Sequence, residues 1–146
     1  MKKVLYLLLL LPISLLSQER ANKTWDDTMS KSKYIIRYDK GEERYEFIAE
    51  KYQREGEYGT LAKGSADRIR QVIAQMDAAL QSRDPDQLFA LGRYKYSYVK
   101  LKMNDLLEVE TLKIEDLIAD DQRKLPVYMM SFGTLEGIKE FVAELE

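Results

Sequence analysis

The sequence predicts an α+β fold, in which an antiparallel sheet of about six strands carries two main helices on one face. Two segments, 65–82 and 134–145, repeat apolar residues at the i, i+3, i+4, i+7 spacing of an amphipathic helix. The other segments are short, rich in tyrosine and β-branched residues, and bounded by turn residues, which is typical of hairpin-linked strands. With 146 residues, 45% of them hydrophobic and 33% charged, the chain fits one domain with a modest core.

Residues 1–17 have the parts of a secretory signal peptide. Lys2 and Lys3 precede an apolar run from Val4 to Leu16, and the small residue Ser17 follows. The run is shorter than the about 20 residues that cross a bilayer, so we favour cleavage after Ser17 over a retained anchor. We therefore expect an exported protein, periplasmic or secreted, without a transmembrane anchor.

Residues 18–32 form a polar N-terminal segment, and the domain is expected at 33–146. Such a segment is often a mobile lead-in. It holds the only tryptophan, Trp25, and we expect that side chain to pack onto the domain rather than to contact a partner, because aromatic residues carry large apolar area.

Three strands are expected before the first helix. Segment 33–38 is rich in β-formers, and 39–42 reads as a turn. Segment 44–52 matches both a helix stripe and a strand face; we choose a strand because a hairpin with 33–38 is the simplest arrangement. A third short strand is expected at 58–62.

The first helix has clear start signals. Ser65 can accept from free N–H groups of the first turn, and Asp67 places a negative charge where the helix dipole favours it. The apolar stripe consists of Ile69, Val72, Ile73, Met76 and Leu80. After Ser82, the sequence Asp84-Pro85-Asp86-Gln87 predicts a capped short helix that Gly92 stops. Capping explains both aspartates without a metal.

Three further strands and a last helix complete the prediction. Segment 93–103 alternates most clearly, and 107–114 is expected to return beside it. One helical turn is expected at 115–121 and an exposed loop at 120–124. The apolar run 126–132 suits a strand buried on both sides, leading through Gly133 into the last helix.

The two helix starts resemble each other in sequence. Aligning 63–76 with 132–145 places Gly64 on Gly133 and Ile69 on Ile138. One interpretation is an internal repeat of a β-β-β-α unit. The other is that any strand turning through glycine into a capped amphipathic helix follows the same rules.

The composition excludes several kinds of chemistry. The chain has no histidine and no cysteine, so it has no Ser-His-Asp triad, thiolate nucleophile, disulfide or usual zinc, iron or copper ligation. Glycine-rich phosphate loops are absent as well. The net charge of −2 argues against binding nucleic acid through its phosphates. We expect no cofactor and no metal.

Carboxylates are the remaining catalytic candidates, namely Glu108, Glu110, Glu115, Asp116, Asp120 and Asp121. In a chain with 25 acidic residues, we favour a solvated face for them. Anion binding at Gly64-Ser65 and Gly133-Thr134 is weighed against simple capping, and capping is preferred.

The surface most suited to binding lies on segment 93–103. Tyr94, Tyr96 and Tyr98 share one strand face with Lys100 and Lys102, and tyrosines flanked by lysines can stack on sugars or hold a protein partner. The competing interpretation is that these tyrosines pack against a helix, since one sheet face must receive the helices.

We expect a non-catalytic binding or accessory protein of a bacterial envelope, with a glycan or another envelope protein as its partner. A small carboxylate-dependent hydrolase or carbohydrate-active enzyme is one alternative, and it requires two carboxyl groups facing one cleft. An inhibitor or immunity-like protein that binds one partner tightly is the other. The oligomeric state does not follow from the sequence.

Overall fold

The computed structural model describes residues 22–52, 56, 58–118 and 127–146. The strands in these ranges are β1 (Lys23–Asp27), β2 (Ser32–Asp39), β3 (Arg44–Lys51), β4 (Tyr58–Gly64), β5 (Leu88–Leu91), β6 (Tyr94–Met103), β7 (Leu107–Asp116) and β8 (Val127–Ser131). The helices are α2 (Ala66–Ser82) and α3 (Phe132–Ala143), and a short 3-10 helix, η2 (Asn104–Leu106), joins β6 to β7. The predicted signal peptide at 1–17 and the loop at 120–124 lie outside the described residues.

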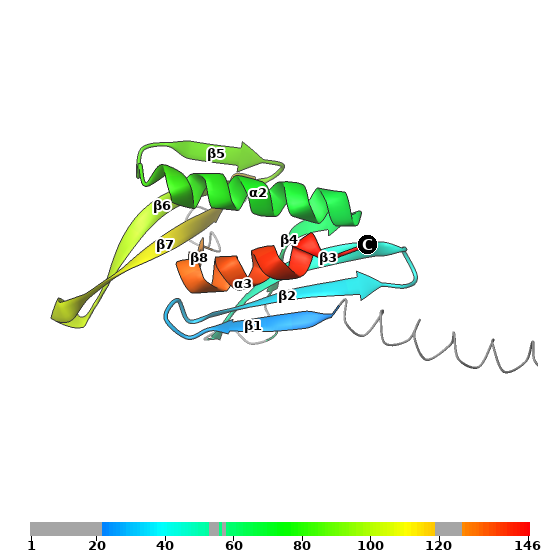
Figure 1. Cartoon of the computed structure of the whole chain (residues 1–146), viewed down its shortest axis with the longest axis horizontal. Helices are drawn as coiled ribbons and strands as arrows, with labels where there is room; N and C mark the ends of the chain where they lie inside the picture. Colours follow the sequence, from blue (N-terminus) through cyan, green and yellow to red (C-terminus); the bar gives the residue numbers. More distant parts are fainter. Residues whose placement is uncertain (1–21, 53–55, 57, 119–126) are drawn as a thin grey trace, which may run out of the picture.

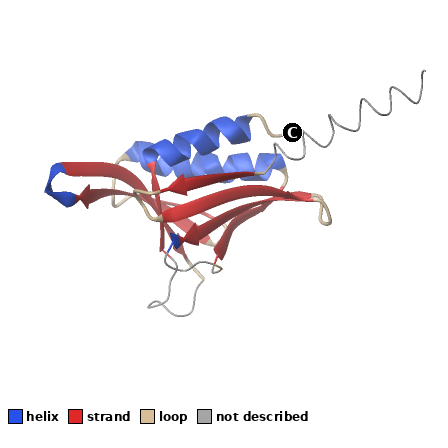
Figure 2. Cartoon of the chain, turned by 90° about the horizontal axis from the view of Figure 1, so that it is seen from below, coloured by secondary structure: helices blue, strands red, loops and turns tan. Residues whose placement is uncertain are grey.

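The strands form two antiparallel sheets, and each follows the order of the chain: β1-β2-β3-β4 and β5-β6-β7-β8. Helices α2 and α3 contact each other and lie on the same side of the strands (Figures 1 and 2). The α+β class is therefore confirmed. The expectation of about six strands in one sheet is corrected to two sheets of four strands.

One added strand, β1, comes from the polar N-terminal segment. It pairs with β2 from Lys23 opposite Ile36 to Asp27 opposite Ser32. The Trp25 ring meets the Phe141 ring of α3 edge-on, with 5.3 Å between the ring centroids. Trp25 therefore packs onto the domain, as expected from its apolar area.

The other added strand, β5, replaces the short helix expected over 88–91. Asp84 instead forms a turn, in which its Oδ1 accepts from the Asp86 N–H at 2.9 Å. The chain then pairs with β6, and Phe89 and Leu91 are partly buried while their neighbours are exposed. Sheet pairing likewise extends β7 to Asp116, where one helical turn was expected. In both places, pairing with a neighbouring strand outweighs the local preference for a helix.

Strand β3 confirms the choice of strand over helix for the segment starting at Arg44. It pairs with β2 on one side and with β4 on the other, so it is an inner strand of its sheet. Phe47 and Ile48 point to opposite faces, and both are buried. Burial on both faces removes the polar alternation, which explains why the segment also matched a helix stripe.

The order of four strands and a helix occurs twice along the described chain. The helix starts nevertheless differ. Gly64, with φ of 144°, precedes Ser65, whose Oγ accepts from the Arg68 N–H at 3.2 Å and caps α2. Gly133 lies inside α3, which begins after Ser131. The expectation that Gly133 precedes the last helix is therefore wrong, and the two helices begin at different positions of the aligned segments.

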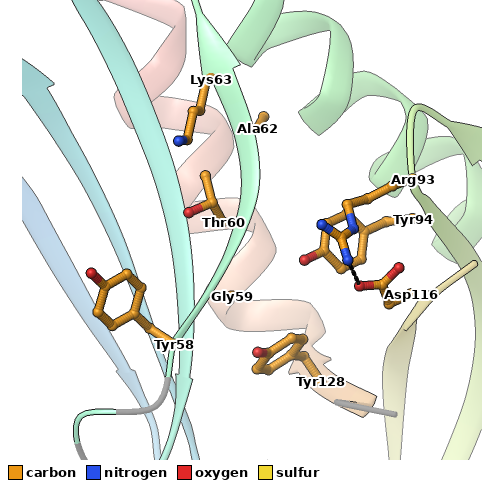
Figure 3. Close-up of a pocket in the computed structure, with 9 residues that line it drawn as sticks. All are labelled: Tyr58, Gly59, Thr60, Ala62, Lys63, Arg93, Tyr94, Asp116 and Tyr128. Atoms are coloured by element: carbon orange, nitrogen blue, oxygen red, sulfur yellow. Dashed lines mark ion pairs between the residues drawn. The ribbon is translucent and has the colours of Figure 1, made fainter. Parts of the chain in front are cut away.

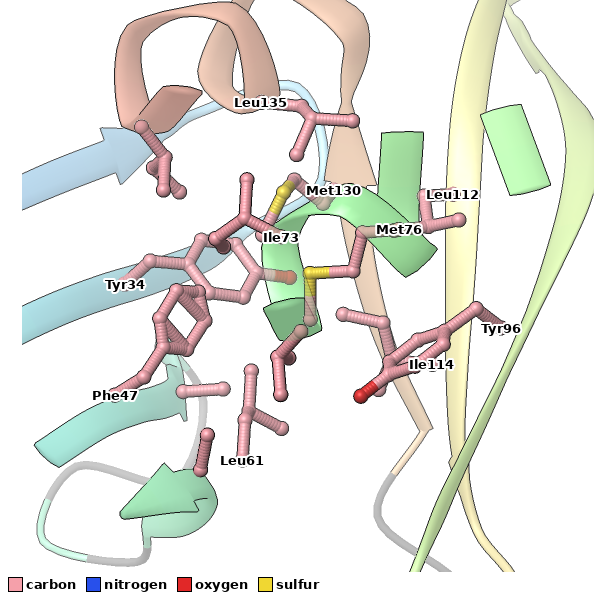
Figure 4. Packing of buried hydrophobic residues seen from close by; sticks show 14 of the residues in the cluster. Tyr34, Phe47, Leu61, Ile73, Met76, Tyr96, Leu112, Ile114, Met130 and Leu135 are labelled. Atoms are coloured by element: carbon pink, nitrogen blue, oxygen red, sulfur yellow. The ribbon is translucent and has the colours of Figure 1, made fainter. Parts of the chain in front are cut away.

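The core fills the space between the helices and both sheets (Figure 4). The predicted apolar stripe of α2 is buried throughout. It meets Tyr34 and Phe47 of the first sheet and Leu112 and Ile114 of the second within one continuous cluster. Helix α2 therefore packs against both sheets, as α3 does through β1 and β7.

Both ends of α3 are held by other elements. At its start, Asp27 Oδ2 accepts from the Ser131 backbone N–H at 2.7 Å and from Ser131 Oγ at 2.8 Å. At its end, Arg70 of α2 donates to the carbonyl oxygens of Val142 at 3.0 Å and Leu145 at 2.7 Å. These contacts satisfy backbone groups that a helix leaves unpaired, and their charges suit the helix dipole.

Candidate functional site

A pocket of about 630 Å³ lies where the first sheet faces the second (Figure 3). Strand β4 contributes one wall, and residues at or beside the ends of β6, β7 and β8 contribute the other. Its lining consists of Tyr58, Gly59, Thr60, Ala62, Lys63, Arg93, Tyr94, Asp116 and Tyr128. This volume is within the range of small-molecule sites, which is about 300 to 1,000 Å³.

The β4 wall belongs to the edge of the first sheet. Among the described strands, β4 pairs with β3 alone, so its other edge has no strand partner there. The Tyr128 ring packs directly against Gly59, because a Cβ at that position would lie 2.5 Å from the Tyr128 Oη. The tyrosine ring therefore closes the pocket beside Gly59 (Figure 3).

An ion pair dominates the opposite wall. Arg93 Nη2 lies 2.6 Å from Asp116 Oδ2, and the Asp116 side chain is buried while that of Arg93 is half-exposed. Hydrogen bonding to Asp116 raises the pKa of Arg93 above its ordinary value. The Leu117 N–H also donates to the Arg93 carbonyl oxygen at 2.7 Å. These contacts fix the backbone of Arg93 and hold its guanidinium at the pocket.

Aromatic and cationic groups line this space. The Arg93 guanidinium carbon lies 5.8 Å from the centroid of the Tyr94 ring, a cation–π distance. Burial, followed by the charge of Asp116, raises the pKa of Tyr94, so its hydroxyl stays neutral at physiological pH. Lys63 adds a second, exposed cation, and Tyr58 has an exposed ring.

The five residues predicted as a binding surface do not form one. Tyr94, Tyr96 and Tyr98 are buried, because their strand face receives α2, and only Tyr94 lines the pocket. Lys100 and Lys102 are exposed farther along β6, and Lys100 Nζ lies 3.5 Å from Glu108 Oε2. The exposed aromatic face is thus corrected to a core face, which is the interpretation that the sheet's need for a helix layer supports.

The candidate carboxylates do not face one cleft either. Glu108 and Glu110 lie near the far end of the β6–β7 hairpin, whereas Asp116 lines the pocket at the other end of β7. Glu115 points to the opposite strand face, where it pairs with Lys95 at 2.7 Å and with Lys113. Burial alone would raise the pKa of Glu115, but the hydrogen bonds with the two lysines outweigh it and lower that pKa. Asp120 and Asp121 lie outside the described residues.

Most of the pocket was missed by sequence reasoning. Arg93 stood at the start of the clearest strand and Tyr128 in an apolar run, and neither position distinguishes a pocket residue from an ordinary one. Their meeting with β4 depends on how the two sheets are placed. The pairing of Arg93 with Asp116 follows from the register of β6 and β7, in which Tyr94 stands opposite Asp116.

The described residues contain no group of three or more acidic side chains placed to hold a metal ion. None of the helices in those residues has the length and apolarity needed to cross a membrane. Comparison of the chain with family models, curated proteins and solved structures finds no match.

Proposed function

We propose that this chain is a non-catalytic binding protein of the bacterial envelope and that its ligand is a glycan carrying an acidic group. The pocket between β4 and the second sheet carries this proposal. The exposed Tyr58 ring on the β4 wall can stack on a sugar face, and the Arg93 guanidinium on the opposite wall can bind a carboxylate or phosphate in two-pronged fashion. Lys63 adds a point charge of the same sign.

The carboxyl groups support a binding role over hydrolysis. Glycoside hydrolysis needs two carboxyl groups about 5 to 10 Å apart across the scissile bond. Among the described lining residues, Asp116 is the one carboxylate, and it is paired with Arg93. This pairing suits a role of Asp116 in positioning Arg93 at the pocket.

The proposal places the protein outside the cytoplasm through cleavage of the 1–17 segment. N-terminal sequencing of the protein recovered from its native cells tests this step, and we expect Gln18 as the first residue. A first residue of Met1 would contradict export through a cleaved signal.

Calorimetric titration tests the ligand. A trimer of galacturonic acid and a neutral galactose trimer serve as probes, and we expect the acidic sugar to bind at least about tenfold more tightly. Arg93→Gln should remove that difference, because it removes the paired cation at the pocket. Tyr58→Ala should weaken both sugars, because it removes the exposed ring from the pocket wall.

Arg37 provides a matched control. Its side chain is 50% exposed and pairs with Glu46 at 2.9 Å, whereas that of Arg93 is 52% exposed and pairs with Asp116. Arg37 does not belong to the pocket lining. Arg37→Gln should therefore leave sugar affinity unchanged. Equal losses from the two arginine variants, or no binding of either sugar by the folded protein, would reject the glycan proposal.

A further inference from the structure

The β6–β7 hairpin extends beyond the sheet to which it belongs (Figures 1 and 2). Strand β5 pairs with β6 only over 94–97, and β8 pairs with β7 only over 111–115. Among the described residues, the part of the hairpin between these limits is a two-stranded ribbon that ends in η2. Two-stranded ribbons are marginally stable in water unless another layer covers them.

The apolar and the charged face of the hairpin exchange sides between the pocket end and the ribbon. Near the pocket, the face toward the helices carries the buried tyrosines of β6, and the opposite face carries Lys95, Lys113 and Glu115. In the ribbon, the helix-side face carries charged residues, namely Lys100, Lys102, Glu108 and Glu110. The opposite face becomes apolar, with Val99, Leu101, Met103, Leu107 and Val109.

This apolar face, together with its two exposed neighbours Leu88 and Leu106, is called the ribbon patch below. Leu88 is 54% exposed and stands opposite Ser97, on the same face as Val99. Leu107 is 53% exposed, and Leu106 at the tip is 95% exposed. Leu106 and Leu107 lie together at the tip and Leu88 lies toward the base, so exposed leucines stand at both ends of the apolar face, and an apolar face of this kind indicates an interaction surface.

Charges at the two ends of this face have opposite signs. At the base, Lys95 and Lys113 surround Glu115, which leaves one positive charge in excess. At the tip, Asp105 is exposed beside Leu106. The face therefore runs from a positive base through an apolar middle to a negative tip. A second copy turned end to end presents the same sequence of surfaces in reverse order.

We propose that the ribbon patch binds a second copy of this chain, with the two ribbons antiparallel and related by a two-fold axis. Apolar side chains then face apolar side chains, and Asp105 of each copy approaches Lys95 and Lys113 of the other. A two-fold interface requires this kind of self-complementary surface. Asp105 and Glu108 beside the leucines disfavour insertion of the tip into an anionic lipid surface.

The size of the patch sets the expected affinity. At 3.3 Å per residue the free part of β6 (98–103) is about 20 Å long and that of β7 (107–110) about 13 Å, so the interface is at most near the lower limit of about 1,000 Å² for specific association. We expect a dimer that dissociates in the micromolar range rather than a permanent one. This dimer is independent of the glycan pocket, because the patch shares none of that pocket's lining residues.

Sedimentation velocity of the purified processed protein across micromolar concentrations tests the dimer. Leu106→Asp should raise the dissociation constant at least about tenfold, because each copy loses a buried leucine. Leu106 is almost fully exposed, so this variant should keep the circular dichroism and thermal midpoint of the wild type. Ile118→Asp is the matched control, since Ile118 is 64% exposed beyond the other end of β7, and it should leave dimerisation unchanged.

Charge reversal tests the antiparallel orientation. Asp105→Lys and Lys95→Glu should each weaken their own dimer, because each places like charges together twice. A mixture of the two variants should associate more tightly than either variant alone, since the introduced lysine then faces the introduced glutamate at one end and the other end keeps its wild-type charges. A wild-type protein that is monomeric throughout, a dimer unaffected by Leu106→Asp, or a mixture no tighter than the separate variants would overturn the proposal.

Discussion

Asp27 and Ser131 join the first described strand to the last helix. The Asp27 carboxylate, 2% exposed, accepts from both the backbone N–H and the hydroxyl of Ser131, and it also accepts from the Ser30 N–H at 3.1 Å. Helix α3 has no acidic residue in its own first turn and no capping hydrogen bond from its own N-cap side chain. Its N-terminal charge therefore comes from an element about a hundred residues earlier in the chain.

Asp27→Ala should lower the free energy of unfolding by about 2 to 4 kcal/mol, because it leaves a buried N–H without an acceptor and removes a charge at a helix start. Urea denaturation measures this loss. Asp39→Ala is the control, because Asp39 Oδ1 accepts from Gly41 and Glu42 in an exposed turn and should contribute less than about 1 kcal/mol. Equal losses for the two variants would show that the cap is not important for stability.

Removal of the hydroxyl group should lower stability at Tyr34 but not at Tyr96. Both side chains are fully buried, but the Tyr34 hydroxyl donates to the Met129 carbonyl oxygen, whereas the Tyr96 hydroxyl has no hydrogen-bond partner in the described structure. Tyr34→Phe should cost about 1 to 2 kcal/mol of unfolding free energy. Tyr96→Phe should be neutral or stabilising, because it removes an unpaired buried polar group. A larger loss for Tyr96→Phe than for Tyr34→Phe in thermal unfolding would contradict this ranking.

Replacing Glu115 should lower the stability of the protein at neutral pH but not in acid. The pKa of Glu115 is lowered from the ordinary value of 4.5, so its ionised form is favoured by folding. That stabilisation is present above the unfolded-state pKa and is lost as the pH falls through the lower folded-state pKa. Glu115→Gln should therefore cost up to about 1 kcal/mol at neutral pH and nothing once both states are protonated.

Chemical denaturation from pH 7 down through the carboxylate range tests the Glu115 prediction. Glu42→Gln is a suitable comparison, because Glu42 pairs with Arg44 at 3.0 Å but its side chain is 58% exposed. Salt screens such an exposed pair, so its removal should change stability less at every pH. A constant penalty for Glu115→Gln across the pH range would argue against the ion pairs as its cause.

Tyr96 also predicts a late step in an alkaline titration. Burial raises its pKa to about 12, so ionisation of Tyr96 costs no stability below the unfolded-state value of 10.0, and stability falls as the pH rises from there through about 12. Tyrosinate absorbance should show a slow phase that coincides with loss of near-ultraviolet circular dichroism. Tyr96→Phe should reduce the amplitude of that phase. An early, fully reversible titration of Tyr96 in the folded protein would oppose this expectation.

The sequence was most informative where one segment determined its own structure. The helix at 65–82 was predicted with its cap and buried stripe, because capping and periodicity are local properties. The segments at 88–91 and 115–116 were predicted as helical, yet pairing with β6 made strands of both. The tyrosines of β6 could be assigned to one face, but which face the helices cover is a tertiary property. The pocket was less predictable still, because it needs the relative placement of two sheets.

The holding of α3 from both ends has a consequence for the order of folding. Its start depends on Asp27 and its end on Arg70, which belong to the first sheet-and-helix unit. Closing such long loops is entropically unfavourable and slows folding. During synthesis, the first sheet and α2 can contact α3 only after the final residues have been made. The chain is therefore expected to reach its native state late in synthesis and in one cooperative step.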